Sequence, residues 1–230
     1  MGLGKRFSYR MYGYIIYLIN SYIRKETNMS QARILTDREY RKVLLHIAKK
    51  KHHSRNKCML FMSHLGGLRV GEIASLTLKH VLNEDGTIKD EVYLTADETK
   101  GNRGRTFLLP EKLREELLDY LCARFKLKAK DLQVLHFTDM TKALFYSQKS
   151  HVDGFDANTL SQWFGRIYRE SGIEGASSHS GRRFFATHLS ENSVNPKIIQ
   201  KLLGHRNLQT TMIYCEVSPK SMRNAVELLS

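Results

Sequence analysis

Only one region of this 230-residue chain has the composition of β-strands. Segments 88–95 (IKDEVYLT) and 105–110 (RTFLLP) are rich in β-branched and aromatic residues, and the basic Gly-Asn turn 99–105 lies between them. This pattern predicts one antiparallel hairpin. Because helical signals dominate elsewhere, the chain is expected to adopt a mainly α-helical α+β fold with one small antiparallel sheet.

Helix start and stop signals divide the rest of the chain. Thr36 to Glu39 has the form of a capping box, and it opens a helix whose buried side is expected to carry Val43, Leu44, Ile47 and Ala48. The basic run 49–57 (KKKHHSRNK) is expected to be a loop with phosphate-binding lysines and arginines. Further helices are expected at 58–65, from about 70, and at 111–125, 159–170, 196–204 and after 219.

The domain organisation is predicted to be simple. Residues 1–33 are expected to form a short N-terminal helical extension and linker, and residues 34–230 the main domain with a C-terminal helix. The apolar run 11–19 follows basic residues, but it is far shorter than the roughly 20 residues of a membrane span, and no cleavage site follows it. Met29 lies in the linker and is an alternative start of translation.

Charge points to a polyanionic partner. The chain has 37 Lys and Arg against 23 acidic residues, a net charge of +14. DNA, RNA and an anionic membrane surface all fit this charge. Three scattered cysteines with no C-x-x-C pair argue against a disulfide framework or a zinc site and fit a reducing cytosol.

Two segments in the first half carry candidate phosphate-binding groups. Arg69, in LRVGE (68–72), follows two glycines and begins a helix, where a guanidinium can grip a phosphate beside free N–H groups. The alternative is a surface arginine paired with Glu72. Lys100 lies in the hairpin turn, from which an ammonium can protonate a leaving oxygen; the alternative is a solvated lysine.

Two segments in the second half complete the pattern. In HSGRRFFATHL (179–189), His179 and Arg182 are three residues apart and share a helix face, whereas His188 is expected to be a buried structural histidine. In LLGH (202–205) and TTMIY (210–214), His205 follows a helix and Tyr214 comes nine residues later. A lone tyrosine at such a place is usually a packing residue.

Taken in order, these motifs resemble those of the tyrosine recombinase and phage integrase family. LRVGE, TKGN, HSGRRFFATHL, LLGH and TTMIY carry the resemblance, which covers about residues 34–218. It implies the tyrosine-recombinase catalytic fold, the fold of DNA breaking-rejoining enzymes. It also implies site-specific recombination (integration, excision or inversion) by a protein encoded by a bacterium, a phage or another mobile genetic element.

The resemblance also implies a role for each candidate residue. Tyr214 would attack the scissile phosphate and form a 3′-phosphotyrosine link, while Arg69 and Arg182 hold the non-bridging oxygens. Lys100 would be the general acid, and His179 would help to deprotonate the nucleophile, since a tyrosine hydroxyl has an ordinary pKa of about 10. His205 would donate a hydrogen bond to the phosphate. No metal ion or nucleotide cofactor is expected.

Partners and alternatives follow from the same resemblance. Double-stranded DNA is the expected partner. It would be bound by a homo-oligomer, a tetramer whose protomers exchange the C-terminal helix through Val226, Leu228 and Leu229. The alternative is that this helix packs on its own domain. A cytoplasmic, nucleoid-associated protein without a membrane partner is expected. Only about 33 residues stand where the family has a DNA-clamping domain, so a minimal recombinase, a remnant and an accessory DNA-binding protein all stay open. Type IB topoisomerase activity and a non-catalytic DNA-binding regulator are the competing functions.

Overall fold

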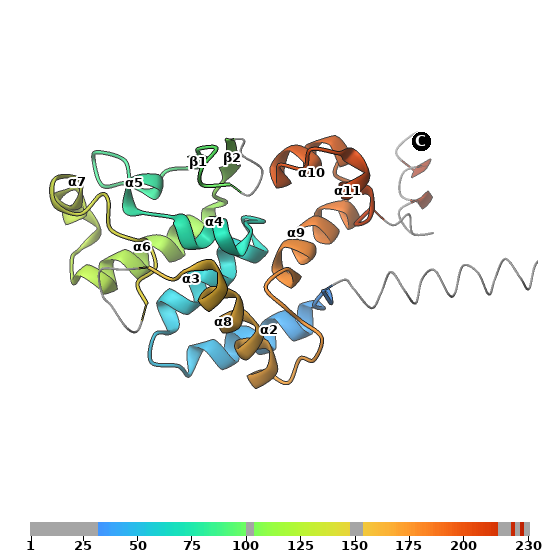
Figure 1. Ribbon diagram of the computed structural model, residues 1–230, viewed down its shortest axis with the longest axis horizontal. Coiled ribbons are helices and arrows are strands. Elements are labelled where there is room, and N and C mark those ends of the chain that lie inside the picture. Colours follow the sequence, from blue (N-terminus) through green and yellow to red (C-terminus); the bar gives the residue numbers. More distant parts are fainter. Residues whose placement is uncertain (1–31, 100–103, 148–153, 216–221, 224–225, 228–230) are drawn as a thin grey trace, which may run out of the picture. The chain divides into compact units, whose positions relative to one another are not determined.

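The computed structural model describes residues 32–99, 104–147, 154–215, 222–223 and 226–227, with the side chain of Phe137 excepted. The chain divides into two units, Met1–Ala32 and Arg33–Ser230, and all the helices and strands described below belong to the second. In order they are α2 (Asp37–Ala48), α3 (His53–His64), α4 (Val70–Ser75), α5 (Leu78–Val81), β1 (Glu91–Leu94), β2 (Arg105–Leu108), α6 (Glu111–Phe125), a 3-10 turn (Ala129–Asp131), α7 (Val134–Thr138), α8 (Ala157–Glu170), α9 (Ser180–Glu191), α10 (Pro196–Leu203) and α11 (Leu208–Met212) (Figure 1). The predicted mainly helical α+β architecture is confirmed.

The hairpin forms where the sequence predicts it. β1 and β2 pair antiparallel, with Val92 opposite Phe107 and Leu94 opposite Arg105. Because strand side chains alternate between faces, these four residues share the buried face. The register therefore places a charged side chain, that of Arg105, on the inner face of the sheet.

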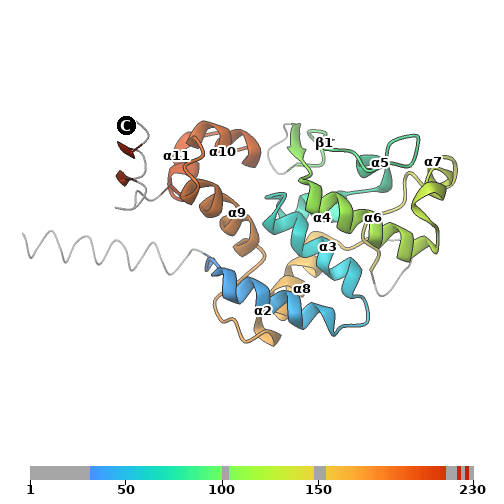
Figure 2. The ribbon, with the colours of Figure 1, turned by 180° about the vertical axis from the view of Figure 1, so that it is seen from behind.

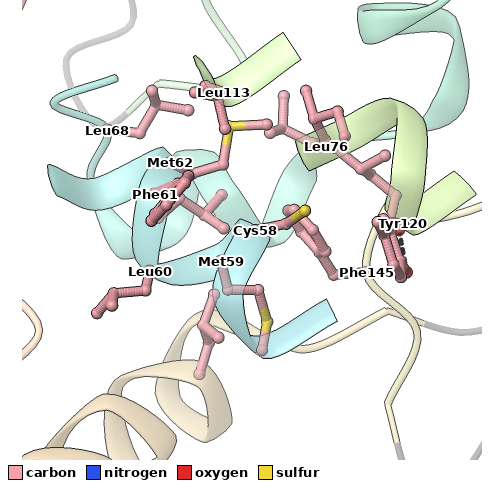
Figure 3. Close-up of a cluster of buried hydrophobic side chains, with 14 of the residues drawn as sticks. Cys58, Met59, Leu60, Phe61, Met62, Leu68, Leu76, Leu113, Tyr120 and Phe145 are labelled. Atoms are coloured by element: carbon pink, nitrogen blue, oxygen red, sulfur yellow. Dashed lines mark hydrogen bonds between the residues drawn. The ribbon is translucent and has the colours of Figure 1, made fainter. Parts of the chain in front are cut away.

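Helix α3 is the centre of the main core. It packs against α2, α4, α6 and α9, and its apolar side chains from Cys58 to Met62 are all at most 1% exposed. Figure 3 shows these side chains pointing in several directions from α3, toward Leu68, Leu76 and Leu113 among others. A helix that is buried around most of its circumference is a core helix and not an amphipathic surface helix.

Helix α2 shows how local signals set its start. The Thr36 hydroxyl accepts a hydrogen bond from the Glu39 amide, and the Glu39 carboxylate accepts one from the Thr36 amide at 2.9 Å. This capping box satisfies two amides that the first helical turn leaves without a partner. Val43 and Ile47 are buried as predicted, whereas Leu44 is only partly buried and Ala48 is exposed, so the predicted buried side is narrower.

The predicted basic loop at 49–57 holds only for residues 49–52 and is wrong for 53–57, because α3 already begins at His53. Arg55 is 3% exposed and donates to the Tyr146 carbonyl at 2.8 Å. Lys50 and Lys57 form ion pairs with Glu170 and Glu116. Most of this basic run therefore has partners within the protein, and Arg55 is withdrawn from solvent.

Helices α9 and α10 share a second, smaller cluster built on Ala186, Ile199 and Leu203, against which Tyr214 and Cys215 pack just after α11. The ribbon shows these three helices next to one another (Figures 1 and 2). Helix α10 opens with the predicted Asn195-Pro196 signal and ends at Gly204, whose φ of +61° is a left-handed helix cap. The prediction for His188 is wrong: its ring is exposed and stacks on Phe184 at a centroid distance of 5.6 Å. Its place on the outer side of α9 explains this exposure.

The predicted C-terminal helix falls partly on residues 216–221, 224–225 and 228–230, which are outside the described residues, as are Leu228 and Leu229. Val226 is described and is 66% exposed. Within the described parts of the chain, none of the helices combines the length and apolar character that crossing a membrane requires.

Candidate active site

Four segments that are distant in sequence meet through buried arginines. Arg182, on α9, donates to the Gly67 carbonyl at 2.5 Å and also to the Leu203 carbonyl. Arg105, on β2, donates to the Leu202 carbonyl at 2.8 Å. These bonds bring the Gly-Gly turn before α4, the hairpin, the first turn of α9 and the end of α10 to one place.

A single buried carboxylate organises the arginines. Glu72 is 1% exposed and accepts from the Arg69 guanidinium at 2.9 Å, from the Arg69 amide at 2.7 Å and from Arg105 at 2.8 Å. Arg182 lies near enough to feel the charges of Arg69, Arg105 and Glu72, so three guanidinium groups gather near one carboxylate and leave an excess of positive charge. Such a site favours an anion.

Arg182 is the more deeply buried of the two predicted phosphate-binding arginines. It is 5% exposed, and burial together with the charges of Arg69 and Arg105 lowers its pKa. The Arg69 side chain is 29% exposed. Each Nη of an arginine carries two hydrogens, so the carbonyl bonds of Arg182 leave it further donors.

His205 lies one residue beyond the cap of α10 and is held by α11. Its Nδ1 lies 2.9 Å from the Thr211 hydroxyl, and Thr211 is fully buried. Burial lowers the pKa of His205 to about 4, and the charges of Arg182, Arg69 and Arg105 act in the same direction. His205 is therefore neutral near pH 7, with its ring orientation fixed by Thr211.

Tyr214 follows α11 and lies against the second cluster. Its ring stacks on His205 at a centroid distance of 6.1 Å, and the Arg183 guanidinium lies over it at 5.7 Å. It is half-buried, so the packing role suggested by its sequence context is also fulfilled. The structure thus brings Tyr214 and His205 into direct contact.

Of the two remaining predicted site residues, His179 is described by the structure and Lys100 is not. His179 is the N-cap residue of α9, one turn before Arg182, and its side chain is exposed. Lys100 lies in 100–103, outside the described residues.

Sequence reasoning missed the group that holds the site together. Glu72 was considered only as a surface partner of Arg69, yet it is buried and binds two arginines. Arg105 is not among the predicted site residues, although its spacing of two from Phe107 places it on the same strand face as a core aromatic. Thr211 and Arg183 carry no signal of their own beyond lying in the quoted motifs.

In the described residues, the charged side chains are not arranged as a set of metal ligands. Across these ranges no three His, Cys, Asp or Glu side chains come close enough to form a ligand set. The charged groups at the site are instead guanidinium groups around Glu72.

Comparison with known proteins places these observations in a family. The model of the phage integrase family matches residues 33–221. Among curated proteins, tyrosine recombinase XerA from Pyrococcus furiosus is 31% identical over 84% of this chain and 60% of its own length. Tyrosine recombinase XerD from Rickettsia bellii is 27% identical over 75% of this chain and 54% of its own.

Solved structures show the same fold at low identity. A crystal structure of XerA recombinase aligns with a TM-score of 0.63 at 21% identity, covering 85% of this chain and 64% of that one. The Tn1549 transposon integrase in complex with transposon right end DNA aligns with a TM-score of 0.60 at 20% identity, covering 86% and 66%. The chain therefore spans about 60% or less of the length of these two curated relatives.

Proposed function

The chain belongs to the phage integrase family, and we propose that it is a site-specific DNA recombinase that cuts and rejoins DNA through Tyr214. The two relatives described above are named as tyrosine recombinases, which supports a recombinase over a topoisomerase or a non-catalytic regulator. The DNA complex of the Tn1549 integrase supports double-stranded DNA as the substrate.

The observation that carries the proposal is the convergence of Arg69, Arg182, His205 and Tyr214. They come from four segments between residues 69 and 214, and tertiary contacts alone unite them. An excess of guanidinium charge beside a half-buried tyrosine fits a phosphodiester held next to its nucleophile.

The proposed chemistry is a transesterification. The Tyr214 oxygen attacks the phosphorus, loses its proton to His179, and forms a phosphotyrosine bond as the bond to the 5′ oxygen breaks. Lys100 gives a proton to that leaving oxygen. Attack by a 5′ hydroxyl from the exchanged strand reverses the step, and the bond energy is retained in the covalent link.

Arg69, Arg182 and His205 act on the phosphate oxygens. Arg69 and Arg182 stabilise the charge that develops in the transition state, and losing one such donor typically costs about 100- to 1,000-fold in rate. When neutral His205 donates from Nε2, its Nδ1 carries no proton and can accept a hydrogen bond. The Thr211 hydroxyl at 2.9 Å is placed to donate it.

Covalent trapping tests the function. The full chain would be incubated with nicked duplexes taken from the neighbourhood of its own gene, and denaturant-resistant adducts would be separated by electrophoresis. Tyr214→Phe retains the ring and its contact with His205 but lacks the nucleophile. Adducts with the wild type and none with Tyr214→Phe are expected.

Three results would contradict the proposal. Adducts formed by both proteins would place the nucleophile elsewhere. DNA binding without adducts from either, across the whole set of duplexes, would favour the regulator. Relaxation of supercoiled plasmid without exchange between two sites would instead identify a topoisomerase.

The assembly is part of the proposal. We propose that protomers form a tetramer on DNA, with a C-terminal helix that docks on a neighbouring protomer; exposed Met222 and Val226 supply apolar contacts. Residues 1–33 would be an extension of the catalytic domain, and an accessory DNA-binding protein would complement its affinity. Sedimentation of the protein with duplex DNA, compared with Val226→Asp, tests the tetramer.

A further inference from the structure

Arg105 is a buried charge in the sheet, outside the set of residues proposed to contact DNA. It is 9% exposed, and pairing with Leu94 fixes it on the inner face of the hairpin. Burying an arginine is costly unless its donors are satisfied. Its two Nη atoms donate to Glu72 at 2.8 Å and to the Leu202 carbonyl at 2.8 Å.

The two acceptors belong to parts of the chain that carry different site residues. Glu72 is in the first turn of α4 and binds Arg69 through both its guanidinium and its amide. Leu202 is in the last turn of α10, three residues before His205. One guanidinium therefore connects the turn that presents Arg69 with the turn that presents His205.

The end of α10 is shaped around this side chain. Gly204 has a φ of +61°, and a Cβ added to it would lie 2.7 Å from Cδ of Arg105. The last carbonyls of a helix have no partners within the helix, and a cation there is favourable. Arg105 and Arg182 satisfy the consecutive carbonyls of Leu202 and Leu203.

We propose that Arg105 is a positioning residue for the recombination reaction, which bridges Glu72 and Leu202 and so sets the distance between Arg69 and His205. This inference rests on the proposed function. Arg105 is also the first residue of β2, so the same bridge fixes the start of the strand that follows Lys100 in the sequence. Because Arg105 is buried, it acts through its neighbours without touching DNA.

The test separates binding from chemistry. DNA affinity and the single-turnover rate of adduct formation at saturating nicked duplex would be measured for Arg105→Met and Arg105→Lys. A displacement of about 1 Å at a reacting group can lower the reaction rate about 100-fold. Arg105→Met is therefore expected to form the adduct about 100-fold more slowly than the wild type, with a DNA affinity within about twofold of the wild-type value. Arg105→Lys keeps the charge but not the planar two-donor geometry and is expected to be intermediate.

A matched control removes the effect of destabilisation. Arg55→Met loses another buried arginine, 3% exposed and bonded to Asn56 and Tyr146, which is not among the proposed site residues. Its adduct rate per folded molecule is expected to equal that of the wild type. Equal rates for Arg105→Met and Arg55→Met, or a loss of affinity that accounts for the slower reaction of Arg105→Met, would overturn the proposal.

A measurement without DNA keeps this inference separate from the recombinase assignment. The titration of His205 would be followed by NMR in the wild type and in Arg105→Met. Arg105 contributes to lowering the pKa of His205, so Arg105→Met is expected to raise that pKa and to shift the Thr211 resonances. If the His205 pKa and the Thr211 resonances are the same in both proteins, the bridging role of Arg105 is refuted, even if the wild type cleaves DNA. If Arg105→Met changes the His205 pKa and the Thr211 resonances but the wild type forms no adduct, the bridging role of Arg105 is supported and the recombinase function is refuted.

Discussion

Replacing Glu72 by Gln should destabilise the fold strongly, although the two side chains have nearly the same shape. The carboxylate is 1% exposed and accepts three hydrogen bonds, two from Arg69 and one from Arg105. A glutamine keeps one acceptor oxygen and turns an N–H group toward a guanidinium. The substitution therefore leaves buried positive charge without its counter-charge.

The size of the effect follows from the burial of the partners. Removing one member of a buried ion pair costs about 3–5 kcal/mol. The Arg69 side chain is 29% exposed, so water can solvate part of its charge when the carboxylate is removed. The Arg105 side chain is only 8% exposed and has little access to water. The lower end of the range applies, and we expect the free energy of unfolding to fall by about 3 kcal/mol, roughly 150-fold in the equilibrium constant.

Urea unfolding followed by circular dichroism measures this difference. With a slope of about 2 kcal/mol/M, the midpoint of Glu72→Gln should fall by about 1.5 M. Glu116→Gln is the control, because Glu116 pairs with Lys57, whose side chain is 41% exposed, and such pairs contribute at most about 1 kcal/mol. If the two variants lose the same stability, the buried carboxylate does not organise the site.

Three further predictions concern the same region and the core. Thr211→Val should slow adduct formation about tenfold at unchanged DNA affinity, because His205 Nδ1 loses its hydrogen-bond partner. Thr210→Val, at an exposed position, is the control. Equal rates for the two variants would contradict the proposed role of Thr211 in orienting His205. Gly204→Ala should cost about 1–2 kcal/mol in urea unfolding, since its φ is +61° and its Cβ would meet Arg105, whereas Gly165→Ala, with open space inside α8, should be neutral or stabilising. Burial lowers the pKa of His64 to about 4 from 6.5, so the unfolded chain binds the proton first. The contribution of neutral His64 to stability is complete above pH 6.5 and is lost as the pH falls toward 4. His64→Gln should therefore remove about 1.4 kcal/mol per pH unit from the slope of the unfolding free energy against pH between these values. An unchanged slope would show that His64 does not titrate there.

Local sequence signals predict most of the longer helices, the hairpin and the order of the motifs. The capping box at Thr36, the proline at the start of α10 and the glycine at its end act within a few residues, so they can be read locally. The candidates Arg69, Arg182, His205 and Tyr214 could be selected from their motifs because each motif is short and ordered along the chain. The helix over 111–125 matches α6 residue by residue for the same reason.

Which charged side chains are structural becomes visible only in the folded molecule. Arg55 and Arg105 both lie in basic runs of the sequence, yet each is buried with backbone carbonyls as partners. His188 was expected inside and lies outside. Side-chain burial depends on which elements pack together, and a carbonyl acceptor carries no signature in the sequence. The bridge from Glu72 through Arg105 to Leu202 joins residues up to 130 positions apart, so it exists only once the hairpin, α4 and α10 have met.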